Sequence, residues 1–288
     1  MSDMAARPEI HREPVGAEQF GIVQRPLSRL ERLYNEEWLR KLLILVVIAG
    51  AWELYARWLD NDLLVPTFSD TVRALAAGIA KGVIPARALA SLEVLLMGYS
   101  VAVALAAVLT IVAISTRLGE DFLETMTAMF NPLPAIALLP LALIWFGIGN
   151  GALIFVLVHS VLWAVALNTH SGFRAVSETM KMVGRNCGLA GLGFVARILI
   201  PAAFPSILAG LKIGWAFAWR TLIAAELVFG VASGKGGLGW YIFESKNQLD
   251  IPDVFAGLLT IILIGLFVEN VIFQLVETRT VRRWGMLS

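Results

Sequence analysis

Long apolar stretches separated by shorter polar segments dominate the chain from residue 42 onward. A membrane-spanning α-helix needs about 20 mostly apolar residues. Six stretches meet or approach that length: 42–58, 94–114, 125–147, 151–169, 206–232 and 254–276. The pattern therefore predicts an all-α integral membrane protein with six transmembrane helices.

The boundary between the third and fourth spans follows from a run without charge. Residues 125–173 contain no Asp, Glu, Lys or Arg over 49 positions. A single helix of that length would far exceed a hydrocarbon core of about 30 Å, so the segment must fold back. Gly147–Gly151 supplies the turn. Pro132, Pro134 and Pro140 predict kinks or an irregular start in the first of these two spans.

Composition agrees with a membrane protein. Hydrophobic residues make up 58% of the 288 residues and charged residues 16%, whereas soluble domains have roughly 45–50% and about 25%. The net charge of +1 gives no reason to expect a nucleic-acid partner. A lone cysteine, Cys187, excludes an internal disulfide framework and disfavours a cysteine metal site.

Orientation follows from the positive charges. Fifteen of the 23 Lys and Arg residues fall in the N-terminal segment, residues 115–124, residues 170–205 and the C-terminal segment, and five fall in the opposite loops. This excess predicts that both termini are cytoplasmic. Residues 1–40 are expected to be a retained cytoplasmic arm, in which the amphipathic stretch that begins at Pro26 is a candidate interfacial helix. Residues 41–288 are expected to be a transmembrane domain that includes a cytoplasmic loop at 170–205.

The cytoplasmic loop is unusually apolar for a connector. Its part 182–201 reads MVGRNCGLAGLGFVARILIP, with glycines between helix-like pieces. Two interpretations remain open: a short helix that docks on a partner, or a helical hairpin packed against the chain's own spans.

This loop resembles the EAA loop of ABC importer permeases. Gly188, Ile198 and Pro201 match its glycine, isoleucine and proline, but the triplet is Met182-Val183-Gly184 and lacks the glutamate. Residues 131–149 (NPLPAIALLPLALIWFGIG), 218–226 (AWRTLIAAE) and 236–239 (GGLG) are similar to the nitrate, sulfonate and taurine subfamily. The likeness extends over about residues 88–285.

The resemblance implies a type I ABC importer permease in a bacterial inner membrane, paired with a second permease, expected to be an identical copy. Two cytoplasmic ATPase subunits would bind ATP and Mg, and a periplasmic binding protein would deliver the substrate. The chain itself would be non-catalytic and need no cofactor, and it contains no GxxxxGK[ST] sequence. The residues implied in coupling to the ATPase are Met182, Val183, Gly184, Arg185, Gly188, Leu189 and Pro201.

Arg220 lies about 20 Å along the fifth span, near mid-membrane. It could attract a small oxyanion in a substrate pathway, or form a structural ion pair with Glu226 or a neighbouring span. Asn131, His159 and Glu226 complete the predicted pathway set. His159 and His170 have no carboxylate at helical spacing, so no metal site is predicted.

Besides an importer of nitrate, taurine or another sulfonate, two other function classes are compatible with a multi-pass membrane protein. A secondary transporter driven by an ion gradient predicts buried carboxylates and paired broken helices in two related halves. A membrane enzyme predicts a convergent set of nucleophile, base or metal ligands. The sequence shows neither pattern, and the secondary transporter stays as the alternative.

Overall fold

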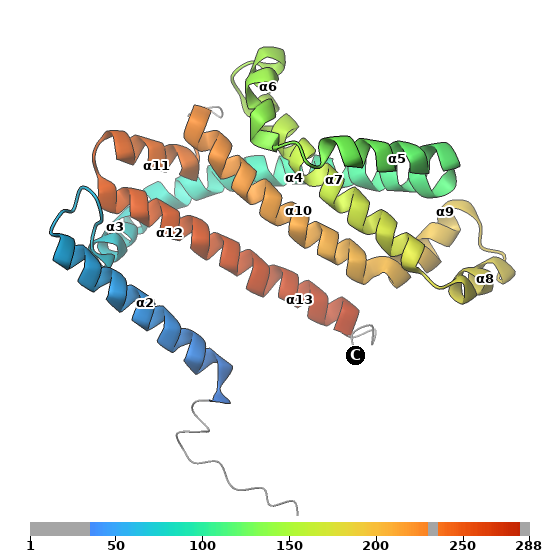
Figure 1. Cartoon of the computed structure of the whole chain (residues 1–288), viewed down its shortest axis with the longest axis horizontal. Coiled ribbons are helices and arrows are strands. Elements are labelled where there is room, and N and C mark those ends of the chain that lie inside the picture. The colour runs from blue at the N-terminus through green and yellow to red at the C-terminus, as the bar shows by residue number, and fades with distance from the viewer. Residues whose placement is uncertain (1–34, 230–235, 283–288) are drawn as a thin grey trace, which may run out of the picture. The chain divides into compact units, whose positions relative to one another are not determined.

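A computed structural model describes residues 35–229 and 236–282, and these are helical in almost their whole length (Figure 1). The chain divides into two compact units, residues 1–51 and 52–288. The longer helices and the short ones that join them are α2 (Glu37–Leu59), α3 (Phe68–Ala80), α4 (Val83–Ser115), α5 (Arg117–Phe130), α6 (Leu139–Phe146), α7 (Asn150–Ala175), α8 (Glu178–Asn186), α9 (Gly191–Phe194), α10 (Ile200–Phe229), α11 (Leu238–Asn247), α12 (Ile251–Phe267) and α13 (Gln274–Glu277).

Five helical runs in the described part are long and apolar enough to cross a membrane. They are Glu37–Leu59, Val83–Ser115, Asn150–Ala175, Gly191–Val228 and Ile251–Val281. The last two are continuous because π-helical turns at Val195–Leu199 and Val268–Phe273 join shorter helices. The all-α membrane fold predicted from the sequence is therefore confirmed.

The third predicted span is a bent pair of helices and not one continuous helix. Arg117–Phe130 and Ala135–Phe146 meet at 88°, so the count reaches six only when this pair is one span. Pro132 and Pro134 provide no backbone N–H, which stops α5. A 3-10 turn, Ala135–Leu138, then leads into α6. The predicted turn at Gly147–Gly151 is confirmed, with Gly147 at φ 71°.

Residues 117–124 lie between the second and third predicted spans, and the structure places them in the first half of α5. Thr116 caps this helix, because its hydroxyl accepts the N–H of Gly119 at 3.0 Å. Gly119, Leu123 and Thr127 are buried at helical spacing, whereas the charged residues lie on other faces. A polar segment with one periodic packing face is thus enough to form a helix here.

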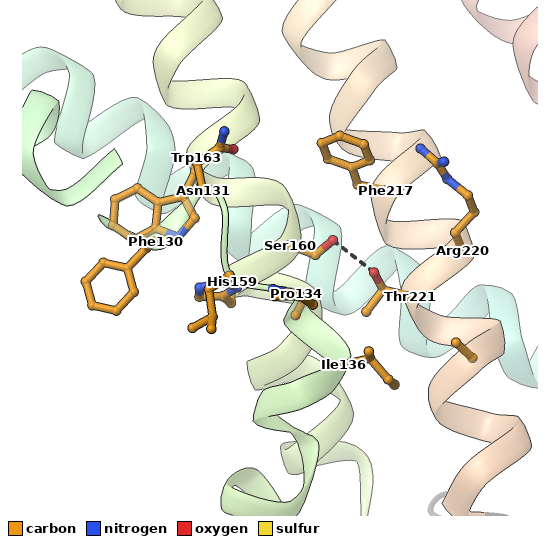
Figure 2. A pocket seen from close by; sticks show the side chains of 13 residues that line it. Phe130, Asn131, Pro134, Ile136, His159, Ser160, Trp163, Phe217, Arg220 and Thr221 are labelled. Carbon is orange, nitrogen blue, oxygen red and sulfur yellow. Dashed lines mark hydrogen bonds between the residues drawn. The ribbon is translucent and has the colours of Figure 1, made fainter. Parts of the chain in front are cut away.

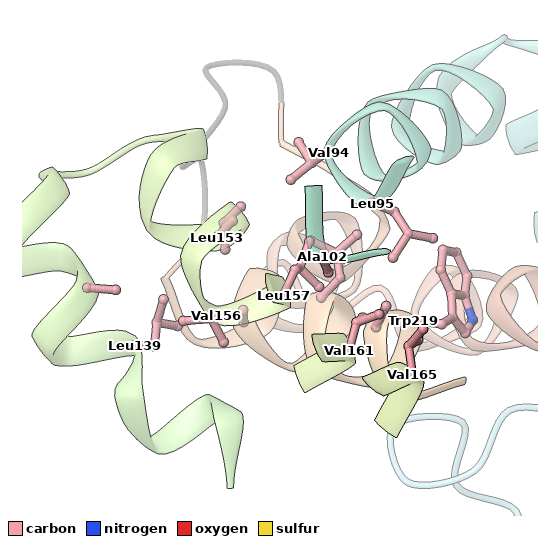
Figure 3. Packing of buried hydrophobic residues seen from close by; sticks show 14 of the residues in the cluster. Val94, Leu95, Ala102, Leu139, Leu153, Val156, Leu157, Val161, Val165 and Trp219 are labelled. Atoms are coloured by element: carbon pink, nitrogen blue, oxygen red, sulfur yellow. The ribbon is translucent and has the colours of Figure 1, made fainter. Parts of the chain in front are cut away.

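α4, α7 and α10 form the centre of the unit of residues 52–288 (Figure 3). Leu95, Ala102, Leu157 and Leu222 are at most 1% exposed. Small residues let the helices approach closely: a Cβ at Gly98 would lie 2.8 Å from Leu157, so a larger side chain does not fit. Tight packing fixes the position of side chains that point away from this core into the neighbouring cavities.

Residues 1–34 and 283–288 lie outside the described residues, as do 230–235. The predicted N-terminal arm therefore stays a prediction, apart from its last residues, which begin α2 at Glu37. Residues 230–235, which precede the GGLG segment at 236–239, and the arginine at 283 also lie outside the described residues.

Candidate functional site

A pocket of about 330 Å³ lies beside the break between α5 and α6 (Figure 2). Three separate parts of the chain line it. They contribute Phe130, Asn131 and Pro134 from the end of α5 and the break, His159, Ser160 and Trp163 from α7, and Phe217, Arg220 and Thr221 from α10. The bend thus places irregular backbone against a cavity, where such backbone is tolerated in a membrane.

A hydrogen bond between hydroxyls joins two walls of this pocket. The oxygens of Ser160 on α7 and Thr221 on α10 lie 3.0 Å apart (Figure 2). A pair of hydroxyls can donate and accept in either direction. This hydrogen bond therefore joins α7 and α10 in the wall of the pocket, and both hydroxyls remain part of the pocket lining.

Arg220 has no ion-pair partner among the residues that the structure describes. Its Nε donates to the carbonyl of Ala216 at 3.1 Å, and its guanidinium lies 5.2 Å from the ring centre of Phe217. These contacts fix one edge of the guanidinium, and its terminal amino groups make no hydrogen bond within the described residues. A structural ion pair with Glu226, the alternative open from the sequence, is not formed.

His159 and Trp163 present unused polar groups beside the same pocket. Both ring nitrogens of His159 and the indole nitrogen of Trp163 are buried without a hydrogen-bond partner in the described part of the chain. Phe130 stacks on Trp163 with ring centres 5.4 Å apart and meets His159 edge-on at 6.1 Å. Buried polar atoms in native proteins normally have a protein, water or ligand partner, so these atoms are positioned to contact whatever fills the pocket.

The structure brings together three of the four predicted pathway residues. Arg220, Asn131 and His159 line one pocket although 89 positions separate the first two. Sequence reasoning missed Phe130, Ser160 and Thr221. In the sequence, two of them are marked only by their position next to a predicted site residue: Ser160 follows His159, and Thr221 follows Arg220 in the AWRTL segment.

Glu226, the fourth predicted pathway residue, lies outside this pocket. It is 4% exposed, and its carboxylate accepts hydrogen bonds from the hydroxyl of Ser91 and the backbone N–H of Gly239 at 2.9 Å. Ser91 in turn accepts the N–H of Leu238 at 2.9 Å. A side chain at Gly237 would collide with the Glu226 carboxylate. Glu226 therefore anchors the glycine-rich segment that leads into α11.

The predicted coupling residues other than Pro201 lie on and just after α8. Ser177 caps this helix, and Glu178 pairs with Lys181 at 2.9 Å. That hydrogen bond lowers the pKa of the Glu178 carboxyl below its usual value. Met182 and Val183 are 53% and 55% exposed. One end of α8 is thus stabilised by polar contacts, while apolar side chains stay uncovered.

Gly184 and the residues after it attach α8 to the start of the long helical run that contains α10. Gly184 is buried, and a Cβ there would lie 2.8 Å from Ile198. Gly188 has φ 76°, a left-handed value that favours glycine. The N–H of Leu189 donates to the carbonyl of Gly184 at 3.1 Å, and that of Gly188 to Arg185 at 2.9 Å. These two bonds form a Schellman motif that ends the helix.

Pro201 and Arg185 complete the predicted set. Pro201 is the second residue of α10 and follows directly on the π-helical turn Val195–Leu199. Arg185 lies 5.9 Å from the ring centre of Phe194. The residues chosen from the loop thus form one continuous structure, a short helix followed by a reversal into the next helical run.

Several long apolar helices, a broken span beside a polar pocket and a short helix between α7 and α10 define a multi-pass membrane transport component. The chain belongs to the family of binding-protein-dependent transport system inner membrane components, whose profile matches residues 98–283. ABC importer permeases of this family act with ATPase and substrate-binding protein partners. The resemblance stated from the sequence is therefore confirmed.

The names of three relatives refer to nitrate, bicarbonate and aliphatic sulfonates. The chain is 25% identical to a nitrate import permease protein of Synechocystis, with 86% of the chain and 92% of that protein covered. It is 27% identical to a bicarbonate transport system permease protein of Synechococcus elongatus, with 77% of each covered. It is 31% identical to a putative aliphatic sulfonates transport permease protein of Escherichia coli, over 59% of the chain and 62% of that protein.

Proposed function

We propose that this chain is the membrane-spanning subunit of an ATP-driven importer for a small oxyanion, of the nitrate, sulfonate (including taurine) or bicarbonate class. The observation that carries the substrate class is the pocket in which Arg220 has no acidic partner within the described residues. A guanidinium presents paired N–H donors that suit planar and tetrahedral oxyanions. The unpaired nitrogens of His159 and Trp163 add polar contacts.

The pocket's size supports a small ligand. Its volume of about 330 Å³ is at the low end of the roughly 300–1,000 Å³ found for small-molecule sites. Aromatic rings of Phe130, Trp163 and Phe217 and several aliphatic side chains form the apolar part of the lining. A charged group at this depth is costly unless it faces protein or water, which supports a pathway role for Arg220.

The assembly we propose follows the family. Two identical permeases form the pathway, two cytoplasmic ATPase subunits bind ATP and Mg, and a periplasmic protein delivers the anion. α8 docks on one ATPase through Met182 and Val183, which are exposed apolar side chains on a short capped helix. The chain lies in a bacterial inner membrane with both termini in the cytoplasm, as the distribution of Lys and Arg favours.

The test is uptake of labelled nitrate, taurine and bicarbonate into proteoliposomes that contain the full chain, its co-purified ATPase subunits and the binding protein. Arg220→Gln should lower ATP-dependent uptake by about tenfold to a hundredfold, since a hydrogen bond to a charged group contributes about 1.5–3 kcal/mol. Arg220→Lys keeps the charge and should lose less. Arg73→Gln, which removes an exposed arginine in α3, is the matched control.

Two results would contradict the proposal. Uptake that survives Arg220→Gln unchanged removes the assigned role of the arginine and with it the argument for an anion. Uptake that follows an ion gradient without any associated ATPase would indicate a secondary transporter instead.

A further inference from the structure

A second polar cavity lies where α8 meets the ends of two spans. Its volume is about 350 Å³, and its walls come from the end of α4, the start of α5, the end of α7, α8 and the helical run before α10. Four cationic side chains line it: Arg117, Arg174, Lys181 and Arg185. This cavity is separate from the pocket that contains Arg220, because the two share no lining residue.

Two of the four cations are already neutralised. Arg174 forms ion pairs with Glu120 at 3.3 Å and Glu124 at 3.0 Å, and Lys181 pairs with Glu178 at 2.9 Å. Arg117 and Arg185 form no ion pair within the described residues, although Arg185 is close enough to the Glu178 carboxylate to help lower its pKa. The excess positive charge of the cavity is therefore carried mainly by two arginines on different elements.

The local structure directs this charge toward the cavity. Arg117 is the first residue of the 14-residue helix α5, so the positive end of that helix adds to its charge. The guanidinium of Arg185 lies 5.9 Å from the ring centre of Phe194, which also lines the cavity. Both arginines are thus placed to contact an anion from opposite structural elements.

An apolar cavity continues from the charged one. Its volume is about 600 Å³, and five residues line both it and the charged cavity: Ile114, Ser115, Arg185, Phe194 and Leu199. The rest of its wall is formed by uncharged residues between Leu189 and Val195. Its charged lining is Arg185 alone within the described residues, so the combined cavity has a cationic end and an apolar end.

The charged end lies at the limit of the membrane-spanning segments. α4 ends at Ser115 and α7 at Ala175, and both helices contribute residues to it. Spans end where the hydrocarbon core gives way to lipid head groups. Basic pockets between helices at the cytoplasmic side are suited to acidic lipid head groups.

We propose that this composite cavity binds an acidic phospholipid. The phosphate contacts Arg117 and Arg185, and part of an acyl chain enters the apolar cavity beside Phe194 and Leu199. A free inorganic anion would use only the charged end. The inference does not depend on which anion the protein transports, because it concerns a different cavity.

Such a lipid would link the segment proposed to dock on the ATPase with the membrane-embedded helices. Arg185 belongs to α8, and Arg117 begins α5. A phosphate held by both arginines would therefore restrain the position of α8 relative to α4 and α5. The lipid composition of the membrane would then act on the segment through which the ATPase subunits are proposed to act.

The experiment is native mass spectrometry of the full chain, purified in detergent and titrated with phosphatidylglycerol or with phosphatidylcholine. The wild type should retain phosphatidylglycerol in preference to phosphatidylcholine. R117Q/R185Q should weaken this binding by about tenfold or more, because two charge-assisted contacts are lost. R197Q/R279Q removes two exposed arginines that do not line either cavity and should bind like the wild type. Circular dichroism establishes that each variant is folded.

A second variant separates a lipid from a free anion. Ala190→Phe places a ring in the apolar cavity and should lower phosphatidylglycerol binding without changing the charge. Inorganic phosphate at millimolar concentration should not displace the lipid from the wild type. The proposal is overturned if R117Q/R185Q binds the lipid normally, if the control pair loses it equally, if inorganic phosphate displaces it, or if purified ATPase subunits expel it.

Discussion

The hydroxyl of Ser91 lies 2.9 Å and 2.8 Å from the two carboxylate oxygens of Glu226, although 135 positions separate the residues. Ser91 is on α4 and Glu226 on α10, so this contact joins two of the central spans. The same hydroxyl accepts the N–H of Leu238. A single small side chain thus connects two helices and the start of a third.

Ser91→Ala should destabilise the membrane domain. It removes one of the two hydrogen-bond donors to the buried Glu226 carboxylate, which keeps the N–H of Gly239, and it leaves the buried N–H of Leu238 without its partner. This costs about 1–3 kcal/mol. Thermal unfolding in detergent should show a Tm about 2–8 °C lower. Ser115→Ala is the control, because that exposed hydroxyl bonds only within its own helix. Equal Tm values for the two variants would show that the Ser91 contact adds no stability.

Gly239→Ala should also destabilise the domain, for a steric reason. A Cβ at Gly239 would lie 2.6 Å from the backbone oxygen of Ile223 and from the Cβ of Glu226. Neither atom is the flexible end of a side chain, so α11 must shift at a cost of about 1–3 kcal/mol. Gly193→Ala meets no atom within 4 Å and should leave Tm almost unchanged. If Gly239→Ala is as stable as that control, α11 is not held against α10 in the way described.

Gly188→Leu should uncouple transport while the membrane domain stays folded. Its φ of 76° costs an L-residue about 1–2 kcal/mol, and relief of this strain moves the end of α8. Binding-protein-stimulated ATP hydrolysis and uptake should both fall in proteoliposomes, whereas Tm in detergent changes little. Gly188→Asn, which tolerates the left-handed region better, should retain more activity. Normal coupled uptake by Gly188→Leu would exclude α8 as the coupling helix.

His159→Phe should separate function from stability. The change removes two buried nitrogens that have no partner in the described residues, so Tm should stay the same or rise. Uptake of the anion should fall by about tenfold if one of these nitrogens contacts it. Tyr99→Phe provides the opposite case, because the Tyr99 hydroxyl donates to the carbonyl of Leu211 at 2.9 Å. Tyr99→Phe should lose about 1 kcal/mol of stability and keep its uptake. If His159→Phe instead lowers the Tm, the histidine has a structural role and the prediction is wrong.

Much of the fold could be predicted because a segment that crosses a bilayer must consist almost entirely of apolar residues. Charge-free stretches mark the spans, and Gly147 marks a reversal. The boundaries were less predictable, since helices continue past the hydrocarbon core: α4 starts at Val83, eleven residues before the apolar stretch at 94. The bend of 88° after Phe130 was indicated by prolines, but its size depends on how α6 packs against α7.

The candidate site could be predicted only where the chemistry is rare. Arg220 and His159 stand out because charged and imidazole groups are uncommon in spans. Ser160 and Thr221 do not, because hydroxyls occur throughout membrane helices. The position of Glu226 depended on Ser91 and Gly239, contacts between distant segments that no local pattern specifies. The sequence therefore indicated which side chains are unusual, and the packing decided which of them meet.

The contact between Gly184 and Ile198 has a mechanical consequence. It fixes α8 to Ile198 near the start of a continuous helical run, Gly191–Val228, in which Arg220 lies 22 residues beyond Ile198. At 1.5 Å per residue this is a distance of about 33 Å. A tilt of about 5° at Ile198 would move Arg220 by about 3 Å, which is the length of a hydrogen bond. If α8 docks on an ATPase as proposed, a small rotation of α8 would therefore move Arg220 far enough to make or break a hydrogen bond with a bound anion.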